Sequence, residues 1–375
     1  MSGSGHNRPL KILHIDPERN WGGGEVQVFG LLSHLAARGH SNELVAHPHG
    51  RLFAACEQLG IPRHPAVIRN DLDLRCVPKL RRLTRTGHYD IVHFHTKRAH
   101  ALSFWLPRGT NRPRYVATRR MDYAEPRNWY TNCLYNRRVD GVVAISESIG
   151  ELLIAAGVDR RKIRVIASGI DVAKFAHGPS ALDRAADQIT VGSMGVLEER
   201  KGHRFLLAAA AELKARGLKL QYRIAGAGSL RHSLEQQAVE LGLADTVRFC
   251  GFVTDTAEFL AQIDLFVMPS LFEGLGVAVL EAMAAGKPVI ASRVGGLAES
   301  VLDGVTGLLI APRDAIVLAD AIEKLVRDPA LAAKLASGAG ERVRQHYTLE
   351  QMALRNEAYY YELLEGAGAD EMIKP

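Results

Sequence analysis

Short apolar runs alternate with amphipathic stretches along most of the chain. The runs have the length of buried strands, and the stretches between them place apolar residues three or four positions apart, as on one face of a helix. We expect strands at residues 11–15, 43–46, 91–94, 115–120, 141–146, 163–166, 189–194, 220–225, 247–253 and 263–268. We expect helices at residues 26–37, 52–59, 79–86, 147–156, 277–285, 315–327 and 329–346. This alternation is typical of parallel sheets covered by helices, so the sequence predicts an α/β fold.

One stretch interrupts the alternation near the middle of the chain. Residues 172–187 contain Gly178, Pro179 and Ser180, which are typical of a linker between domains. The chain has 375 residues, and 47% of them are hydrophobic, which is enough for two domains that each bury a core. We therefore expect a first domain at residues 1–174 and a second domain at residues 187–346.

Charge is distributed unevenly between the two halves of the chain. Residues 1–175 hold 27 Lys and Arg against 15 Asp and Glu, a net charge of +12, whereas the remainder holds 20 against 26, a net charge of −6. The positive excess indicates either an anionic partner, such as a lipid surface or an acidic glycan, or surplus arginines on solvated faces. The densest basic run, residues 75–85, could rest on anionic headgroups or form a solvated helix face.

Cysteine usage and apolar run lengths bear on the location of the protein. The four cysteines lack the close pairing of a zinc site or a disulfide framework, which fits a reducing cytoplasm. No apolar run reaches the roughly 18 residues of a membrane span, and residues 1–9 lack the apolar core of a signal peptide. We expect a cytoplasmic protein that could attach peripherally to the inner face of the cytoplasmic membrane.

The most informative stretch is residues 269–288. Two glycines, Gly274 and Gly276, separate a buried strand from a helix-forming run, so unpaired N–H groups and the positive end of a helix dipole point at one place, as suits a phosphate. Two carboxylates, Glu273 and Glu281, flank the helix start. The helix rises roughly 7 Å between Gly276 and Glu281, so the carboxylates can hold hydroxyl groups on different parts of one ligand. This stretch predicts a diphosphate site with sugar or ribose hydroxyls nearby.

Two other interpretations of these carboxylates are open. Glu273 and Glu281 could be ordinary solvated helix residues, although Glu281 lies among apolar residues, where a charge needs a partner or a ligand. They could also be the acid and base of a glycosidase, which places two carboxyl groups at a sugar but has no use for a phosphate-binding helix start.

The Glu-x7-Glu spacing of Glu273 and Glu281 resembles that of retaining glycosyltransferases of the GT-B fold, family 4 (glycosyl transferases group 1). The resemblance extends over nearly the whole chain and includes a hinge-like Ser-Gly-Ile-Asp at 168–171. It implies two Rossmann-like domains facing a cleft, with the acceptor bound by the first and the nucleotide-sugar donor by the second. It also implies a C-terminal helix at 347–365 that crosses back to the first domain, and we expect the tail from 366 onward to fray.

The resemblance also implies roles for individual residues. Glu273 would contact the sugar hydroxyls and Lys201 the leaving diphosphate, which gains negative charge as the glycosidic bond breaks. Relatives have a first cation directly after Gly195, where this chain has Val196, and Arg200 beside Lys201 could supply the missing charge as a third catalytic residue. The implied donor-binding residues are Gly23, Gly24, Arg120, Gly195, Phe252, Val253, Gly274, Leu275, Gly276 and Glu281.

Arg120 departs from the family pattern, because a His often stands at this place and lies near the donor sugar. The pKa of an arginine side chain lies above 12, which rules out proton shuttling at neutral pH. We therefore expect Arg120 to bind or stabilise negative charge.

Three histidines, His93, His95 and His100, raise the question of a metal site. Alternating histidines at a strand end without a carboxylate companion are more often structural or substrate-facing, so we expect no metal ligand among them. The resemblance implies that the reaction is metal-independent and needs no cofactor besides the nucleotide-sugar donor.

We expect a retaining glycosyltransferase that moves a sugar from a nucleotide-sugar donor to a glycan or lipid-linked glycan in cell-envelope or exopolysaccharide biosynthesis. The alternative is a non-catalytic protein of the same fold that binds a nucleotide-sugar or an anionic glycan. Nucleic acid is not an expected partner, because no basic stripe is interleaved with aromatic residues.

Overall fold

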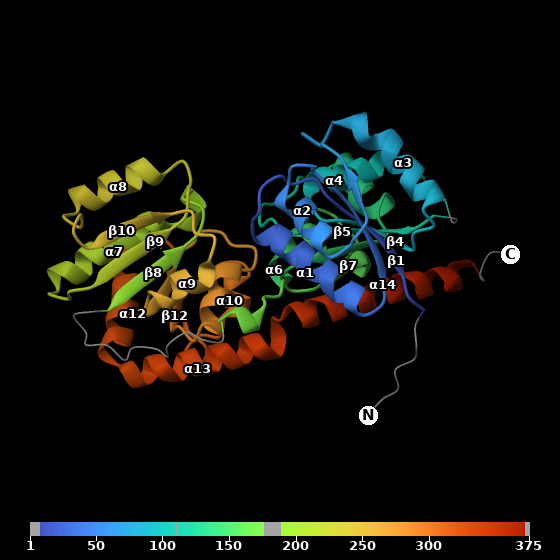
Figure 1. Ribbon diagram of the computed structural model, residues 1–375. Helices are drawn as coiled ribbons and strands as arrows, with labels where there is room; N and C mark the ends of the chain where they lie inside the picture. Colours follow the sequence, from blue (N-terminus) through green and yellow to red (C-terminus); the bar gives the residue numbers. More distant parts are fainter. Residues whose placement is uncertain (1–7, 110–111, 176–188, 372–375) are drawn as a thin grey trace, which may run out of the picture. The chain divides into compact units, whose positions relative to one another are not determined.

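The computed structural model describes residues 8–109, 112–175 and 189–371, and side chains as far as residue 366 (Figure 1). The chain divides into two compact units. Unit 1 comprises Met1–Gly169 with Leu349–Pro375, and unit 2 comprises Ile170–Thr348.

Unit 1 is built on a parallel sheet of seven strands in the order β3-β2-β1-β4-β5-β6-β7. The strands are β1 (Lys11–Asp16), β2 (Ser41–Ala46), β3 (Arg63–Pro65), β4 (Ile91–Phe94), β5 (Arg114–Arg119), β6 (Gly141–Ala144) and β7 (Ile163–Val165). The strand order reverses direction between β1 and β4, and ligands of open parallel sheets bind beyond the carboxyl ends of the strands at such a point.

Helices connect these strands, and four of them lie where the hydrophobic pattern predicts helices. They are α1 (Gly23–Ala37), α2 (Arg51–Gln58), α3 (Val77–Thr86), α4 (Lys97–Ala101), α5 (Trp129–Asn132) and α6 (Glu147–Ala155), with short helical turns η1 (Leu74–Cys76), η2 (Leu102–Trp105), η3 (Cys133–Arg137) and η4 (Arg160–Lys162). The Ser146 hydroxyl caps α6, because it accepts a hydrogen bond from Ile149 N–H at 3.3 Å.

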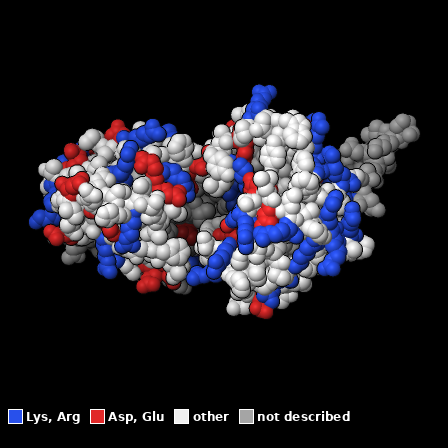
Figure 2. Space-filling view, turned by 90° about the horizontal axis from the view of Figure 1, so that it is seen from above, with Lys and Arg blue, Asp and Glu red and all other residues white. Residues whose placement is uncertain are grey.

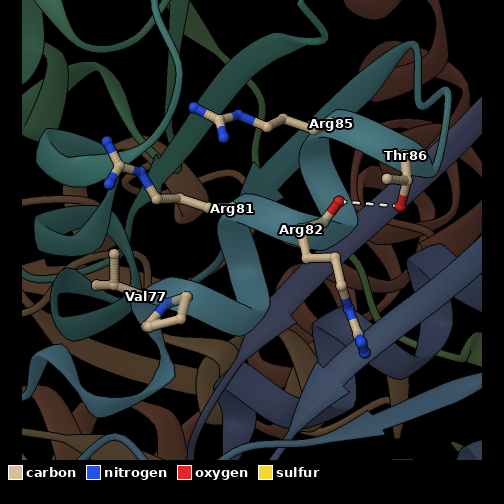
Figure 3. Close-up of a pocket in the computed structure, with 6 residues that line it drawn as sticks. Val77, Arg81, Arg82, Arg85 and Thr86 are labelled. Atoms are coloured by element: carbon tan, nitrogen blue, oxygen red, sulfur yellow. Dashed lines mark hydrogen bonds between the residues drawn. The ribbon is translucent and has the colours of Figure 1, made fainter.

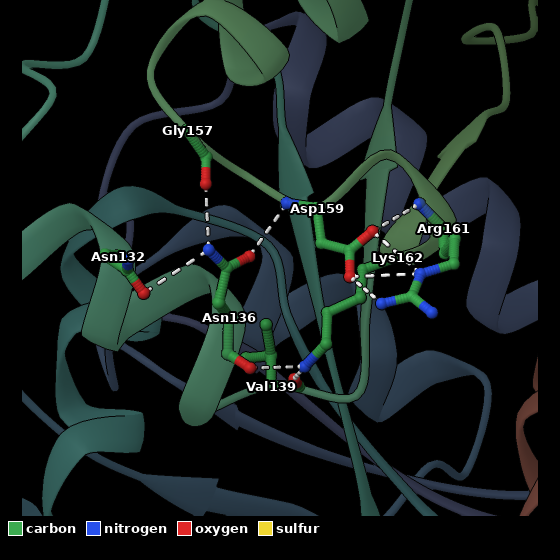
Figure 4. A network of polar contacts seen from close by, with 7 residues as sticks. All are labelled: Asn132, Asn136, Val139, Gly157, Asp159, Arg161 and Lys162. Atoms are coloured by element: carbon green, nitrogen blue, oxygen red, sulfur yellow. Dashed lines mark hydrogen bonds and ion pairs between the residues drawn. The ribbon is translucent and has the colours of Figure 1, made fainter.

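A polar network fastens η3 to the segment between α6 and β7 (Figure 4). The Asn136 amide donates to the Gly157 carbonyl at 2.9 Å and accepts from Asp159 N–H at 2.9 Å. The Lys162 ammonium donates to the carbonyl oxygens of Asn136 at 2.6 Å and Val139 at 2.8 Å. These bonds satisfy the polar groups around the irregular turn, so this corner of unit 1 is held in one conformation.

The C-terminal helix α14 (Leu349–Glu371) belongs to unit 1. Its Met352, Ala353 and Tyr360 are buried in one cluster with residues of α1 and of strands of the sheet. We expected a frayed tail from residue 366 onward; this was wrong for residues 366–371, which continue α14, and residues 372–375 lie outside the described part of the chain. The run from Gly366 to Glu371 has no proline to stop a helix.

Unit 2 contains a second parallel sheet, with six strands in the order β10-β9-β8-β11-β12-β13. The strands are β8 (Thr190–Met194), β9 (Gln221–Ala225), β10 (Val247–Gly251), β11 (Leu265–Met268), β12 (Val289–Ser292) and β13 (Leu308–Ile310). The helical elements are η5 (Val172–Phe175), η7 (Glu199–Lys201), α7 (His203–Ala215), α8 (Arg231–Glu240), α9 (Thr256–Ala261), α10 (Val277–Ala284), α11 (Leu297–Ser300), α12 (Ala315–Arg327) and α13 (Pro329–His346).

The two units are joined where the chain passes between them twice. Ile170 N–H donates to the Tyr347 carbonyl at 2.8 Å, and Ile170 forms a β-bridge with Thr348. This pairing ties residues 170–175 to unit 2, so unit 1 ends at Gly169, whereas we expected the first domain to extend to residue 174. Of the expected linker, residues 176–187 lie outside the described part of the chain, and residues 172–175 form η5.

Both units therefore have the expected doubly wound α/β architecture, and the fold prediction is confirmed at this level. Among the described helices, none has the length and the apolar character needed to cross a membrane.

Candidate active site

Two of the three residues that we expected to be catalytic, Lys201 and Glu273, meet in unit 2. The Lys201 ammonium forms an ion pair with Glu273 Oε2, and both side chains are buried. The Ser270 hydroxyl also donates to this carboxylate oxygen, at 3.3 Å. A buried ion pair needs such additional hydrogen bonds to offset its desolvation. Lys201 ends η7 and Glu273 follows β11, so the fold brings together residues that are 72 positions apart.

Glycines pack the surrounding loops directly on one another. A Cβ atom on Gly226 would lie 1.8 Å from the Gly195 carbonyl oxygen, and one on Gly202 would lie 2.0 Å from the Pro269 carbonyl oxygen. A Cβ atom on Gly296 would lie 2.2 Å from the Gly274 carbonyl oxygen. Each of these loops follows the carboxyl end of a strand, namely β8, β9, β11 or β12. Only glycine permits such close backbone approach, so the loops form one continuous edge.

The expected diphosphate residues lie on this edge. Gly276 adopts a positive φ of 83° as the N-cap of α10. Gly274 and Leu275 precede it, and the Leu275 carbonyl accepts from the Ser300 hydroxyl at 3.0 Å. The first N–H groups of a helix lack intrahelical acceptors, and the helix dipole is positive at this end, so the site can receive an anion.

Arg200 precedes Lys201 in the chain but has a different side-chain partner. Its guanidinium donates from Nε to Glu198 at 3.1 Å, and its backbone carbonyl accepts from Leu271 N–H at 2.7 Å. The side chain is half-buried. Val196, which stands where relatives have a cation, is exposed. The carbonyl of Arg200 therefore fixes the loop after β11, whereas its guanidinium is paired with Glu198.

Glu281 occupies a separate environment on α10. It is half-buried, and burial raises the pKa of its carboxyl to about 7, with the Lys174 charge and the Thr256 hydroxyl offsetting the shift in part. Lys174 and Thr256 belong to η5 and to the start of α9. The two carboxylates of the Glu-x7-Glu motif thus have different partners, which is consistent with their holding different parts of one ligand.

Phe252 and Val253 follow β10, at the edge strand of the same sheet. Phe252 is 65% exposed and Val253 is half-buried. An exposed aromatic ring at the carboxyl end of a strand offers a flat surface for a nucleobase.

In unit 1, the expected residues surround the start of α1. Gly23 and Gly24 open this helix, and a Cβ atom on Gly24 would lie 3.8 Å from Arg120 Cδ. The Arg120 guanidinium donates to Ser168 Oγ at 3.4 Å, and its Nε is buried without a hydrogen-bond partner among the described residues. Burial lowers the pKa of Arg120, while the nearby charges of Asp16 and Glu25 favour its charged form. Arg120 is thus a cation with unused donors beside a helix start.

Sequence reasoning missed Asp16 and Glu25 as members of this cluster. Asp16 is the last residue of β1, and burial together with the Glu25 charge raises the pKa of Asp16 to about 7. Glu25 accepts a hydrogen bond from Gly22 N–H at 2.6 Å, and burial raises the pKa of Glu25 as well. Two features of the sequence could have indicated these residues. Asp16 is an acidic residue at the carboxyl end of the first strand, and Glu25 is an acidic residue in the first helical turn after three glycines.

The structure adds a third histidine, His14, to two of those considered above. His14, His93 and His95 are buried, and one ring nitrogen of each lies within 4.8 Å of the others. Among the described residues, this is the group that could hold a metal ion. His14 Nδ1 lies 2.9 Å from His95 Nε2, and both ring nitrogens of His93 lie within hydrogen-bond distance of hydroxyls, those of Tyr360 and Thr118.

Burial lowers the pKa of all three histidines, which are therefore neutral at pH 7 and form a hydrogen-bonded layer inside unit 1. His100 lies apart from this layer and is within 3.3 Å of the Leu134 carbonyl.

Comparison with known families matches both parts of the chain. Residues 21–174 match the family model described as Glycosyltransferase Family 4, and residues 179–342 match the model described as Glycosyl transferases group 1. A lipopolysaccharide core biosynthesis glycosyltransferase of Rhizobium meliloti is 31% identical over 345 residues, covering 91% of this chain and 96% of that protein. A lipopolysaccharide core biosynthesis mannosyltransferase of Rhizobium leguminosarum is 33% identical over 246 residues, covering 63% of this chain and 68% of that protein.

Solved structures show the same fold. An Anabaena protein, HepE, determined in complex with UDP and glucose, superposes with a TM-score of 0.80 at 24% identity and covers 94% of this chain and 100% of its own. A Rickettsia africae glycosyltransferase superposes with a TM-score of 0.83 at 20% identity and covers 96% and 99%, respectively. The family matches, the relatives and the fold agree, and the chain belongs to the family 4 (group 1) glycosyltransferases of the GT-B fold and is a sugar-transferring enzyme.

Proposed function

We propose that the enzyme transfers a sugar, with retention of configuration, from a nucleoside-diphosphate donor to a glycan or lipid-linked glycan of the cell envelope. The single observation that carries the donor part of the proposal is the buried Lys201–Glu273 pair beside the glycine-flanked start of α10. The names of the rhizobial relatives support a lipopolysaccharide core acceptor, and the UDP and UDP-glucose in complexes of the HepE structures support a nucleotide-sugar donor.

The proposed chemistry assigns the residues of unit 2 to successive parts of the donor. Departure of the nucleoside diphosphate places negative charge on its terminal phosphate, and the Lys201 ammonium and the α10 N-terminus stabilise that charge. Glu273 keeps Lys201 in place and accepts hydrogen bonds from sugar hydroxyls. Glu281 accepts hydrogen bonds from the ribose hydroxyls. Arg200 and Lys201 supply the positive charge at the diphosphate, so we propose that the reaction needs no metal cofactor.

Donor cleavage tests the proposal without knowledge of the acceptor. The protein is incubated with UDP-, GDP-, ADP- and CMP-sugars, and the released nucleotide is measured. Slow hydrolysis of one donor is expected. Binding of a nucleotide-sugar without any release would instead support a non-catalytic binding protein, and the absence of both would contradict the proposal.

We further propose that unit 1 attaches peripherally to an anionic membrane through α3. The exposed residues Arg81, Arg82 and Arg85 line a shallow pocket with Val77, Pro78 and Thr86, and they form no ion pair within the described part of the chain. Figure 3 shows Arg81 and Arg85 pointing to one side of the helix and Arg82 to another. In Figure 2, Lys and Arg prevail over the visible face of unit 1, whereas both signs mix over unit 2.

The other two cations of the basic run, Arg75 and Lys79, already have partners within unit 1. Arg75 forms an ion pair with Asp73 at 2.6 Å, and the Lys79 ammonium donates to the Pro65 carbonyl at 2.7 Å. The proposed membrane contact therefore rests on three arginines of α3 rather than on the whole run.

A further inference from the structure

Unit 1 exposes several large aromatic side chains. Trp129 is 69% exposed, Trp105 is 44% exposed, and Tyr123 and Tyr130 are exposed to a similar degree as Trp105. Tryptophan and tyrosine normally bury most of their surface, and a group of exposed aromatic residues marks an interaction site more often than single ones do.

These residues come from η2, from α5 and from the loop between β5 and α5. The Phe104 ring lies 5.4 Å from the Trp105 ring and 6.3 Å from the Trp129 ring, between centroids, so η2 and α5 are in contact. The Arg138 guanidinium lies 4.6 Å from the Phe104 ring centroid. We call Trp105, Tyr123, Trp129 and Tyr130, with Phe104 beneath them, the aromatic platform.

Ion pairs and cation–π contacts hold the loop that carries Tyr123 in place. The Tyr123 ring contacts the Arg119 guanidinium at 4.3 Å and the Lys97 ammonium at 5.3 Å. Glu125 pairs with both cations, at 2.7 Å to Arg119 and 3.2 Å to Lys97. The Arg119 guanidinium also donates to the Tyr123 carbonyl at 2.8 Å. A surface fixed in this way binds a ligand with little loss of conformational entropy.

The platform lies in segments that follow the carboxyl ends of two central strands. The loop that carries Tyr123 begins at Arg120, directly after β5, and η2 follows α4, which itself follows β4. In open parallel sheets this is the edge at which ligands bind. The loop that carries Tyr123 therefore starts on the same edge of the sheet as Arg120 and the start of α1, and α5 follows this loop in the chain.

We propose that the aromatic platform binds the sugar rings of the acceptor oligosaccharide, an inference that rests on the proposed function. A pyranose ring presents C–H groups on its faces and hydroxyls around its rim, so it stacks on an indole ring while polar neighbours bind the hydroxyls. Arg127 and Asn128, both exposed next to Trp129, can serve as those neighbours.

Charge favours a glycan over a lipid bilayer as the occupant. In the loop that carries Tyr123, Glu125 is neutralised by its ion pairs with Arg119 and Lys97, whereas Asp122 has no ion pair within the described part of the chain. Unpaired carboxylates oppose both anionic headgroups and insertion into acyl chains. They do not oppose a hydroxyl-rich ligand, because a carboxylate accepts hydrogen bonds from hydroxyls.

The test compares Trp129→Ala and Trp105→Ala with Val239→Ala, which removes an exposed apolar side chain from α8 of unit 2. Binding to maltoheptaose, a mannan oligosaccharide and lipid-free lipopolysaccharide core oligosaccharide is measured by calorimetry and by protection of tryptophan fluorescence from acrylamide. We expect wild type and Val239→Ala to bind at least one of these, with Trp129→Ala about ten-fold weaker or worse. Donor hydrolysis without acceptor should be unchanged in all three variants.

The outcomes separate this proposal from the proposed function. Failure of donor hydrolysis in wild type would contradict the enzymatic role, while the binding comparison would still test the platform. Equal oligosaccharide binding by wild type and Trp129→Ala would overturn the platform proposal, as would the absence of wild-type binding to all three oligosaccharides. Loss of binding to phosphatidylglycerol vesicles in Trp129→Ala, with oligosaccharide binding intact, would also overturn it in favour of a membrane contact.

Discussion

The two glutamates of the Glu-x7-Glu motif differ in how their charge is balanced. Glu273 forms a buried ion pair with Lys201 and accepts a hydrogen bond from Ser270. Glu281 has no ion-pair partner within 4 Å among the described residues, and its carboxyl has a pKa of about 7. The charge of Glu273 is therefore balanced by a cation, whereas Glu281 changes its charge within the neutral range.

Donor affinity should depend on pH through Glu281. Because its pKa is raised, the group is neutral below about pH 7 and ionised above it, and only the ionised form makes charge-assisted hydrogen bonds to ribose hydroxyls. We expect nucleotide affinity to rise between pH 6 and pH 8. In Glu281→Gln the affinity should fall about ten- to a hundred-fold at pH 8, since a hydrogen bond to a charged group contributes roughly 1.5–3 kcal/mol.

Calorimetric titration with UDP, or with whichever nucleotide the donor panel selects, measures this dependence. Glu299→Gln, on α11 of the same unit, serves as a matched control. Nucleotide affinity that is independent of pH in wild type, or unchanged in Glu281→Gln, would show that this carboxylate does not contact the donor.

Single residues were predicted from sequence where a motif constrained them. Glu273 and Lys201 were named together on the strength of the family resemblance, and the structure brings them into contact. Asp16, Ser168 and Lys174 were missed, because their proximity to Arg120 or Glu281 arises from tertiary packing that no spacing along the chain records.

At the scale of elements, the proposed membrane contact depends on the three exposed arginines of α3. Each properly placed arginine near an anionic leaflet contributes about 1 kcal/mol, so changing Arg81, Arg82 and Arg85 to Gln should weaken partitioning on the order of a hundred-fold. Binding should also weaken above about 0.5 M salt, where the screening length falls below roughly 5 Å. The measurement is co-sedimentation with phosphatidylglycerol liposomes at low and high salt.

The control for α3 is the exchange of three exposed arginines from unit 2, Arg204, Arg231 and Arg248, for Gln. Equal pelleting of the α3 variant and wild type at low salt would identify α3 as an ordinary solvated helix. It would also favour a soluble acceptor.

Packing of α14 against the sheet depends on a glycine of β6. A Cβ atom on Gly141 would lie 2.2 Å from the Tyr359 hydroxyl oxygen, which donates to the Lys162 carbonyl at 2.7 Å. Gly141→Ala should displace this buried tyrosine and lower the free energy of unfolding by about 1–3 kcal/mol, seen as a lower urea midpoint. Gly366→Ala on α14 itself has open space around it and should leave the midpoint unchanged or raise it. Equal midpoints for both variants would contradict this packing.

Several of the longer elements were predicted closely from the sequence, but the helices α7 and α8 were not expected. Strand 91–94 and helices 315–327 and 329–346 have the expected bounds, because their hydrophobic periods are strong and their ends carry turn residues. The short pieces η1, η2, α5 and α9 were not expected, because segments of three to six residues have too few positions to display a period. The aromatic platform stands on two of these pieces, which is why the sequence alone did not indicate it.

At the scale of the whole molecule, each unit contributes one sheet edge lined with glycines and candidate ligand-binding side chains. Unit 2 holds the Lys201–Glu273 pair and α10, and unit 1 holds Arg120 and the start of α1. Division of the protein into two units was predictable from the repeated alternation of strands and helices. The point at which the chain changes unit was not, because the pairing of Ile170 with Thr348 joins residues 178 positions apart.

The central claim is that the Lys201–Glu273 pair performs sugar transfer. It is tested by single-turnover cleavage of the selected donor, measured for Lys201→Ala, Glu273→Gln and the double variant. Lys214→Ala, which removes an exposed lysine from α7, is the control, and urea midpoints verify that each variant is folded. We expect each single variant to lose about 10²–10³ in rate, and the double variant to lose little more than either, because the two side chains act as a unit. Full turnover rate in Lys201→Ala or Glu273→Gln, with only the Michaelis constant altered, would contradict the account.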